Sequence, residues 1–192
     1  MPEKDKDPFI ESEDHWLSIT REESEPRGAG KWMLHTEQPH RLYRILRDAL
    51  RKGKLPSALS IKTKAKTPSR QGAVYIYTGP YTDRDRVLGL AEELRTLNDA
   101  HDLKLNRPLI YKTDLHNTWC ETLARPGDGY HELLKRNWLY RYKDGKLVVN
   151  AAIHALHRAM ENPPENADRE FLIIRSLLPD HLFATPRGNK EE

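Results

Sequence analysis

The run WLYRYKDGKLVV, residues 138–149, constrains the fold more than any other stretch of the sequence. Its centre is an Asp-Gly pair, and both flanking arms are rich in aromatic, aliphatic and β-branched residues. An Asp-Gly pair between two such arms is typical of a two-residue turn in a β-hairpin. The chain is therefore predicted to contain antiparallel strands.

Strand patterns and helical patterns alternate along the rest of the chain. Strands are predicted from KWMLH, SALSIKTKAK, AVYIYTG and RPLIYKTD, at residues 31–35, 57–66, 73–79 and 107–114. Helices are predicted from the apolar periodicity of residues 39–54, 82–100, 150–162 and 168–178. This order favours an α+β domain with a curved, mainly antiparallel sheet backed by helices on one face.

Local residues predict where the elements begin and end. Pro39 suits the first turn of its helix and Gly53 suits the end of the same helix. Thr82 is the expected cap of the next helix. Residues 1–29 are predicted to be a largely disordered leader in which DHWLSI could dock as an arm. A single domain spans 30–183, and 184–192 form a disordered tail.

Composition limits the cellular setting and the class of protein. The one cysteine, Cys120, excludes an internal disulfide framework and fits a reducing, cytoplasmic compartment. The N-terminal residues are charged and lack the apolar core of a signal peptide, and no apolar stretch is long enough to span a membrane. The chain is 192 residues long, so its core can be stable without disulfides or a structural metal.

Positive charge is concentrated in one part of the chain. The totals nearly balance, at 32 Lys and Arg against 29 Asp and Glu, but residues 41–72 hold ten of the basic residues and a single acid, Asp48. Arg41, Arg44, Arg47 and Arg51 share one helix face, which is either a phosphate-binding surface or an ordinary solvent face. A basic face of the domain is therefore expected.

Lysines and tyrosines alternate on two neighbouring predicted strands. Lys62 and Lys64 project from one side of their strand, and Tyr75 and Tyr77 lie on the next. Cations beside aromatic rings are typical of sites that bind a nucleotide or a single nucleic-acid strand. Lysines at a sheet edge also prevent edge-to-edge association, so both interpretations stay open.

Common catalytic and cofactor motifs are missing from the sequence. It has no glycine-rich phosphate loop, no HExxH and no GxSxG elbow. His154 and His157 have a helical spacing that could ligate a metal, but no carboxylate stands beside them. We expect neither a metal site nor a cofactor.

The segment YKTDLHNTW, residues 111–119, places polar and aromatic side chains directly after a buried strand. Strand alternation puts Lys112 and Asp114 on one face, opposite Tyr111 and Thr113. Asp114 could pair with a lysine or accept hydrogen bonds from a base, and Trp119 could cover the ligand. The alternative is a surface loop that carries polar side chains without a binding role.

Four motifs in order resemble the basophilic leukemia-expressed protein family. They are the GKW strand, the GKL segment with the lysine-rich strand that follows it, the VYIYT strand with its helix, and the YKTD strand, between about residue 14 and about residue 120. The matching positions are Gly30, Lys31, Trp32, Gly53, Lys54, Leu55, Lys62, Val74, Tyr77, Thr78, Asp83, Asp85, Val87, Tyr111, Lys112 and Asp114.

The resemblance implies a fold like the cap-binding translation initiation factor 4E. It also suggests an enzymatic alternative, because relatives are sometimes labelled phosphothreonine lyases, which use a Lys-x-His pair on one strand. Lys31 occupies the lysine position and Met33 the histidine position, so His35 would have to act as the acid. The second phosphate-holding lysine of those lyases falls near Tyr77 here and is missing, so Lys62 or Lys112 would have to substitute for it.

The sequence thus predicts a surface on the concave face of the sheet for a phosphate-bearing ligand, most simply a nucleotide or single-stranded RNA. The predicted contacts are Lys31, Lys62, Lys64, Tyr77, Lys112, Asp114 and Trp119. The alternatives are a phosphate-eliminating lyase with Lys31 as base and His35 as acid, and a scaffold that binds a protein partner through its C-terminal helices.

Overall fold

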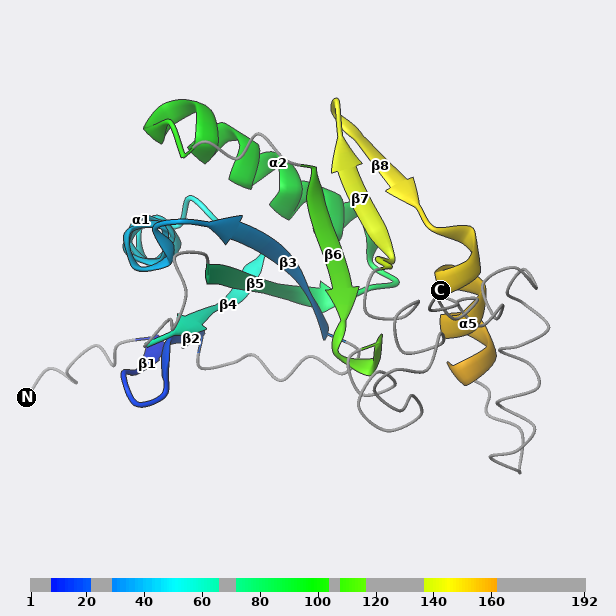
Figure 1. Ribbon diagram of the computed structural model, residues 1–192, viewed down its shortest axis with the longest axis horizontal. Helices are drawn as coiled ribbons and strands as arrows, with labels where there is room; N and C mark the ends of the chain where they lie inside the picture. The colour runs from blue at the N-terminus through cyan, green and yellow to red at the C-terminus, as the bar shows by residue number, and fades with distance from the viewer. Residues whose placement is uncertain (1–7, 22–28, 66–71, 104–107, 117–136, 162–192) are drawn as a thin grey trace, which may run out of the picture.

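The computed structural model describes residues 8–21, 29–65, 72–103, 108–116 and 137–161 (Figure 1). These residues form an eight-stranded sheet in the order β1-β2-β4-β5-β3-β6-β7-β8. The strands are β1 (Phe9–Ser12), β2 (Trp16–Arg21), β3 (Ala29–Thr36), β4 (Ala58–Lys64), β5 (Gly72–Pro80), β6 (Leu109–Thr113), β7 (Tyr140–Lys143) and β8 (Lys146–Val149).

Every neighbouring pair of strands in this sheet is antiparallel. The described helices are α1 (Pro39–Arg51), α2 (Arg84–His101) and α5 (Ala151–Glu161). Helices α1 and α2 cover one face of the curved sheet, and α5 lies beside the end of β6 (Figure 1). The predicted α+β class, with an antiparallel curved sheet backed by helices, is confirmed.

The segment expected to be a leader supplies two strands. Residues 9–12 and 16–21 form β1 and β2, and β2 pairs with β4 from Trp16 opposite Lys64 to Thr20 opposite Ser60. Ile19 anchors β2, because its side chain is fully buried in the core. The docking arm is therefore part of the sheet. The predicted tail, 184–192, and the predicted helix at 168–178 lie outside the described residues.

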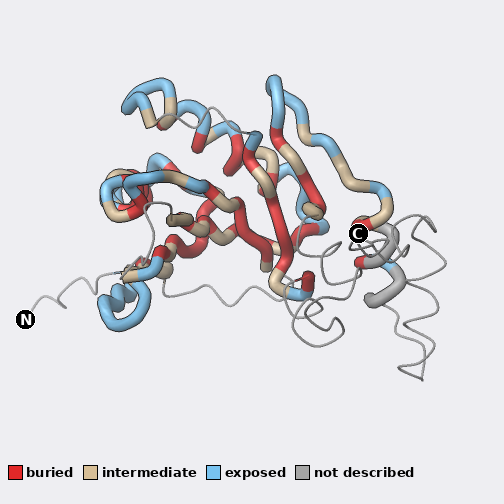
Figure 2. Tube along the Cα trace, viewed as in Figure 1, coloured by how far each residue is buried: buried red, intermediate tan, exposed pale blue. Residues whose placement is uncertain are grey.

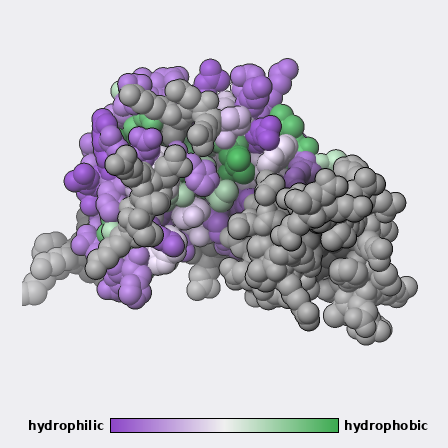
Figure 3. Space-filling view, viewed as in Figure 1, coloured by the Kyte–Doolittle hydropathy of each residue, from purple (hydrophilic) through white to green (hydrophobic). Residues whose placement is uncertain are grey.

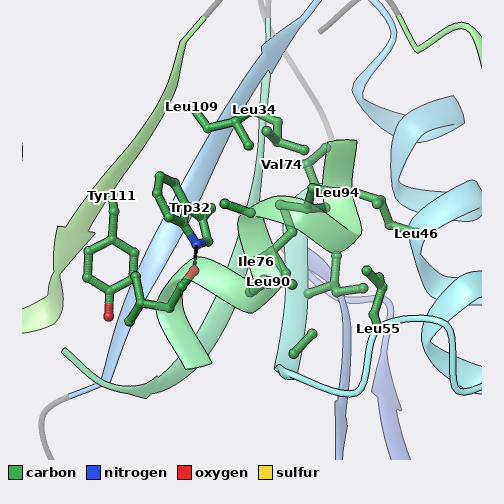
Figure 4. Packing of buried hydrophobic residues seen from close by; sticks show 14 of the residues in the cluster. Trp32, Leu34, Leu46, Leu55, Val74, Ile76, Leu90, Leu94, Leu109 and Tyr111 are labelled. Carbon is green, nitrogen blue, oxygen red and sulfur yellow. Dashed lines mark hydrogen bonds between the residues drawn. The ribbon is translucent and has the colours of Figure 1, made fainter. Parts of the chain in front are cut away.

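The core lies between the sheet and helices α1 and α2. Trp32 and Leu34 of β3 and Ile76 of β5 meet Leu46 of α1 and Leu90 of α2, and all five are at most 2% exposed (Figure 4). The buried segments run along the central strands, whereas hairpin tips and the outer face of α2 are exposed (Figure 2). Alternation along each strand therefore leaves every second side chain on the opposite face.

Trp32 joins β3 to α2 by a hydrogen bond as well as by packing. Its indole Nε1–H donates to the carbonyl of Val87 at 3.1 Å (Figure 4). The Tyr111 ring packs edge-on to Trp32 at 5.3 Å between ring centroids, and a methyl group built on Gly30 would overlap that ring. Glycine in the GKW segment thus makes room for a tyrosine on the adjacent strand.

The turn and cap predictions are confirmed with one correction. Pro39 occupies the first turn of α1, and Gly53, with φ of +69°, ends it. Asp144 and Gly145 both have positive φ, as a type I′ hairpin turn requires. The cap of α2 is Asp83 rather than Thr82, because the Asp83 carboxylate accepts the backbone N–H of Arg86 at 3.1 Å.

Candidate functional site

Side chains of five strands gather on the face opposite α1 and α2. We call it the lysine face and define it by Lys31, Lys62, Tyr75, Tyr77 and Lys112. Strand register places them in two rows across the sheet. One row is Ser60, Tyr77, Lys31 and Lys112, and the next is Lys62, Tyr75, Met33, Ile110 and Arg141.

Tyr77 stands between two lysines of neighbouring strands. The Lys31 ammonium lies 5.1 Å from the centroid of its ring, and the Lys62 ammonium lies 4.6 Å from the same centroid. Cation–π attraction at these distances holds both ammonium groups beside the ring. In this arrangement the Tyr77 ring orients lysines, in addition to the stacking role predicted from the sequence.

The Tyr77 phenol is suited to this position because it stays neutral. Its burial raises the pKa of the hydroxyl above the ordinary 10.0, and the nearby Lys62 ammonium opposes this increase. The Asp114 carboxylate raises the pKa further. At neutral pH the ring therefore contributes a polarisable face and a hydroxyl, without neutralising the lysines.

Lys31 and Lys112 oppose each other directly across β3 and β6. Both residues are only 7% exposed. Like charges at directly opposite positions repel, so the site concentrates positive charge at some energetic cost. The carboxylate that relieves Lys31 is Asp114, whose Oδ1 accepts from Lys31 Nζ at 2.6 Å.

Asp114 comes from the helical turn that follows β6, and its side chain is half exposed. None of the strands from β2 to β8 contains an aspartate or a glutamate. The cationic character of the lysine face is therefore opposed chiefly by Asp114 among the described residues. Such a surface attracts anionic partners.

An aromatic group borders the lysine face at β2. Trp16 packs edge-on to Tyr75 at 6.1 Å between ring centroids, and the Lys64 ammonium lies 6.0 Å from the Trp16 ring. Trp16 keeps 38% of its surface exposed. The sequence analysis named Lys64 as a contact but not Trp16, because the strand that pairs Trp16 with Lys64 was expected to be a leader.

A second aromatic group lies across the sheet at β7. The guanidinium carbon of Arg141 is 4.5 Å from the centroid of the Trp138 ring. Arg141 is opposite Ile110 of β6, so it belongs to the same row as Lys62. The sequence analysis missed Arg141; alternation within the hairpin, with Tyr140 and Tyr142 facing the core, was the pattern that could have found it.

Lys31 and His35 lie on the same face of β3. They are four residues apart on β3, which corresponds to about 13 Å between their Cα atoms at about 3.3 Å per residue. An acid and a base for one elimination must both reach the reacting atoms of one substrate. The lyase alternative therefore requires a substrate whose reacting atoms both side chains can reach.

The segment that follows Lys112 also has a structural role. The Thr113 hydroxyl accepts the backbone N–H of His116 at 3.0 Å and lies 2.6 Å from Nε2 of His157. His157 Nδ1 lies 2.8 Å from the carbonyl of Ile153, which can only accept. His157 Nδ1 therefore donates to Ile153, and Nε2 shares the second hydrogen bond with the Thr113 hydroxyl. The histidines thus attach α5 to the end of β6.

The arginine row lies on the other side of the sheet from the lysine face, on α1. Arg47 pairs with Asp48 at 3.1 Å and Arg51 with Glu11 of β1 at 2.9 Å. Arg41 donates to Gln38 at 3.2 Å, and Arg44 is exposed. These contacts fit the solvent-face interpretation of this row.

Other predictions are placed as follows. Trp119 and the predicted helix at 168–178, one of the C-terminal helices expected to bind a protein partner, lie outside the described residues. Within the described ranges no three His, Cys, Asp or Glu side chains are grouped to hold a metal ion, and no helix is long and apolar enough to cross a membrane. The described surface seen in Figure 3 is mostly hydrophilic, with small hydrophobic patches.

Comparison with known proteins gives one family. The family model for basophilic leukemia-expressed protein Bles03 matches residues 21–119, which include β3 to β6 and both covering helices. No curated protein matches the sequence.

Two solved structures of a translation initiation factor are similar to the chain. Schistosome eIF4E complexed with m7GpppA and 4E-BP has a TM-score of 0.40 and 12% identity, covering 52% of this chain and 59% of that chain. Ascaris suum eIF4E-3 with m7G cap has a TM-score of 0.37 and 13% identity, covering 52% of this chain and 62% of that chain. The similarity thus spans about three fifths of either structure.

Proposed function

The chain belongs to the basophilic leukemia-expressed protein Bles03 family, and we propose that it binds a phosphate-bearing ligand, a nucleotide or single-stranded RNA, on its lysine face. One observation carries the proposal. Lys31 and Lys62 lie beside the Tyr77 ring and Lys112 lies directly opposite Lys31, on strands that contain no acidic residue.

The arrangement suits phosphate better than it suits a carboxylate. The three ammonium groups come from three strands and supply several donors on one face of the sheet. A phosphate group offers several acceptor oxygens and more than one negative charge, so it can relieve the repulsion between Lys31 and Lys112. Asp114 supplies an acceptor beside them, which a base or ribose hydroxyl can use.

The test compares two double variants that remove the same charge from different faces. K62Q/K112Q alters the lysine face, and R41Q/R44Q alters the exposed side of α1. The probe is a fluorescein-labelled oligouridylate octamer, followed by anisotropy at about 50 mM and about 200 mM salt. Far-UV circular dichroism checks that both variants are folded.

The lysine variant should bind at least about tenfold more weakly, because two charge-assisted contacts are lost. Its plot of log affinity against log salt should be shallower by about 1.4, since each contact to a single strand contributes about 0.7. The arginine variant should bind like the parent. Equal losses in both variants, or no loss in K62Q/K112Q, would refute the proposed site.

A further inference from the structure

The lysine face is bordered at two opposite ends by an indole with a cation beside it. At β2, Trp16 stands with Lys64 and Tyr75. At β7, Trp138 stands under the guanidinium of Arg141. The lysines lie on the strands between them, so ring, phosphate-binding and ring subsites follow one another across the sheet.

Register fixes the distance between the two ends. Trp16 is opposite Lys64 of β4, and Arg141 is opposite Ile110 of β6. Between β2 and β7 the sheet order contains five neighbouring steps, β2-β4-β5-β3-β6-β7. At about 4.8 Å a step the two ends are about 24 Å apart along the sheet. A mononucleotide has one base and can stack on only one of these indoles.

Arg141 carries a buried donor at this end of the lysine face. Its Nε is buried, and none of the described residues accepts a hydrogen bond from it. The Trp138 ring holds the guanidinium in place at 4.5 Å. A buried donor without an acceptor is costly, and an incoming phosphate or base oxygen would satisfy it.

We infer that the ligand is a single nucleic-acid strand of several nucleotides that crosses strands β2 to β7, with bases stacked at Trp16 and Trp138 and its backbone on the lysines. This inference rests on the proposed function and narrows it from any nucleotide to an oligonucleotide. Stacking on aromatic side chains together with backbone contacts to cations is how proteins hold single strands without reading their sequence.

The experiment measures chain length and ring dependence together. The probe is the labelled oligouridylate octamer, competed with uridine monophosphate, with the unlabelled octamer and with an oligothymidylate octamer. The variants are W16A and W138A, and W16F and W138F keep a ring at each position. K62Q/K112Q is measured in parallel, so that the phosphate contacts are assessed separately.

The octamer should compete far better than the mononucleotide. W16A and W138A should each weaken octamer binding by between about fivefold and about 100-fold, the range of one lost base–ring stack, and the phenylalanine variants should recover most of it. Equal binding of RNA and DNA octamers would assign recognition to rings and backbone, and tighter RNA binding would add a contact to the 2′-hydroxyl.

Two results would overturn the inference while leaving the proposed function in place. One is competition by the mononucleotide as strong as that by the octamer. The other is octamer binding unchanged in W16A and W138A but weakened in K62Q/K112Q. Absence of octamer binding to the parent protein at low salt would overturn both.

Discussion

Gly30 leaves no space for a Cβ atom, and replacing it with alanine tests the packing of β3 against β6. Gly30 is paired on both sides, with Thr78 of β5 and Thr113 of β6, so its backbone cannot move outward. A Cβ atom there would lie 2.7 Å from Cε1 of Tyr111 and would overlap further atoms of the ring.

The Tyr111 ring has no room to yield to that methyl group. It is fully buried, with Trp32 at 5.3 Å and Tyr140 at 5.6 Å between ring centroids. Overpacking of a rigid core costs about 1–3 kcal/mol, and a fixed ring beside a fixed backbone belongs at the upper end. Replacing a strand glycine recovers about 0.5–1 kcal/mol of backbone entropy. We therefore expect Gly30→Ala to lower the free energy of unfolding by about 2 kcal/mol.

Urea denaturation followed by tryptophan fluorescence measures this change. The matched control is Gly79→Ala on β5, where the new methyl group meets only the flexible side chain of Arg86 at 3.1 Å. That variant should stay within about 0.5 kcal/mol of the parent. Combining Gly30→Ala with Tyr111→Leu should cost less than the two changes separately. A Gly30→Ala protein as stable as the parent would refute the described packing.

Three further predictions concern stability. Tyr111→Phe removes a buried hydroxyl that no described residue bonds, so denaturation should show stability within about 1 kcal/mol of the parent or higher. Thr113→Val deprives His116 and His157 of the shared hydroxyl and should cost about 2–4 kcal/mol, whereas Thr113→Ser should not. Burial and the Glu11 carboxylate raise the pKa of Tyr43 from 10.0 to about 12. The contribution of Tyr43 to the free energy of unfolding should therefore be complete below pH 10 and should decrease between pH 10 and about pH 12. The Tyr43→Phe variant should show a smaller decrease over that range.

The sequence predicted the central elements well because their patterns are local. Alternation in KWMLH and SALSIKTKAK placed Trp32 in the core and Lys62 on the other face, and the Asp-Gly pair fixed the hairpin turn. Strands β1 and β2 were not predicted, because residues 9–12 and 16–21 are short segments within a charged N-terminal region. Their place depends on pairing with β4, and such long-range pairing has no local pattern.

The candidate site was predicted in composition but not in arrangement. Alternation put Lys112 and Asp114 on one face, and the structure brings Asp114 to Lys31, which is distant in sequence. The sequence pattern could not show that Tyr77 stands between two lysines, because the strand order β4-β5-β3-β6 is not sequential. The contribution of Arg141 depends on the same order, since β7 joins the sheet through β6.

The most direct test of the lysine face is an amide NMR titration of the protein with the oligouridylate octamer. The account predicts saturable shift changes in β3, β4, β5 and β6, centred on Lys31, Lys62, Tyr77 and Lys112, with little change in α1. Changes confined to the arginine row of α1, or no change at saturating octamer and low salt, would contradict it.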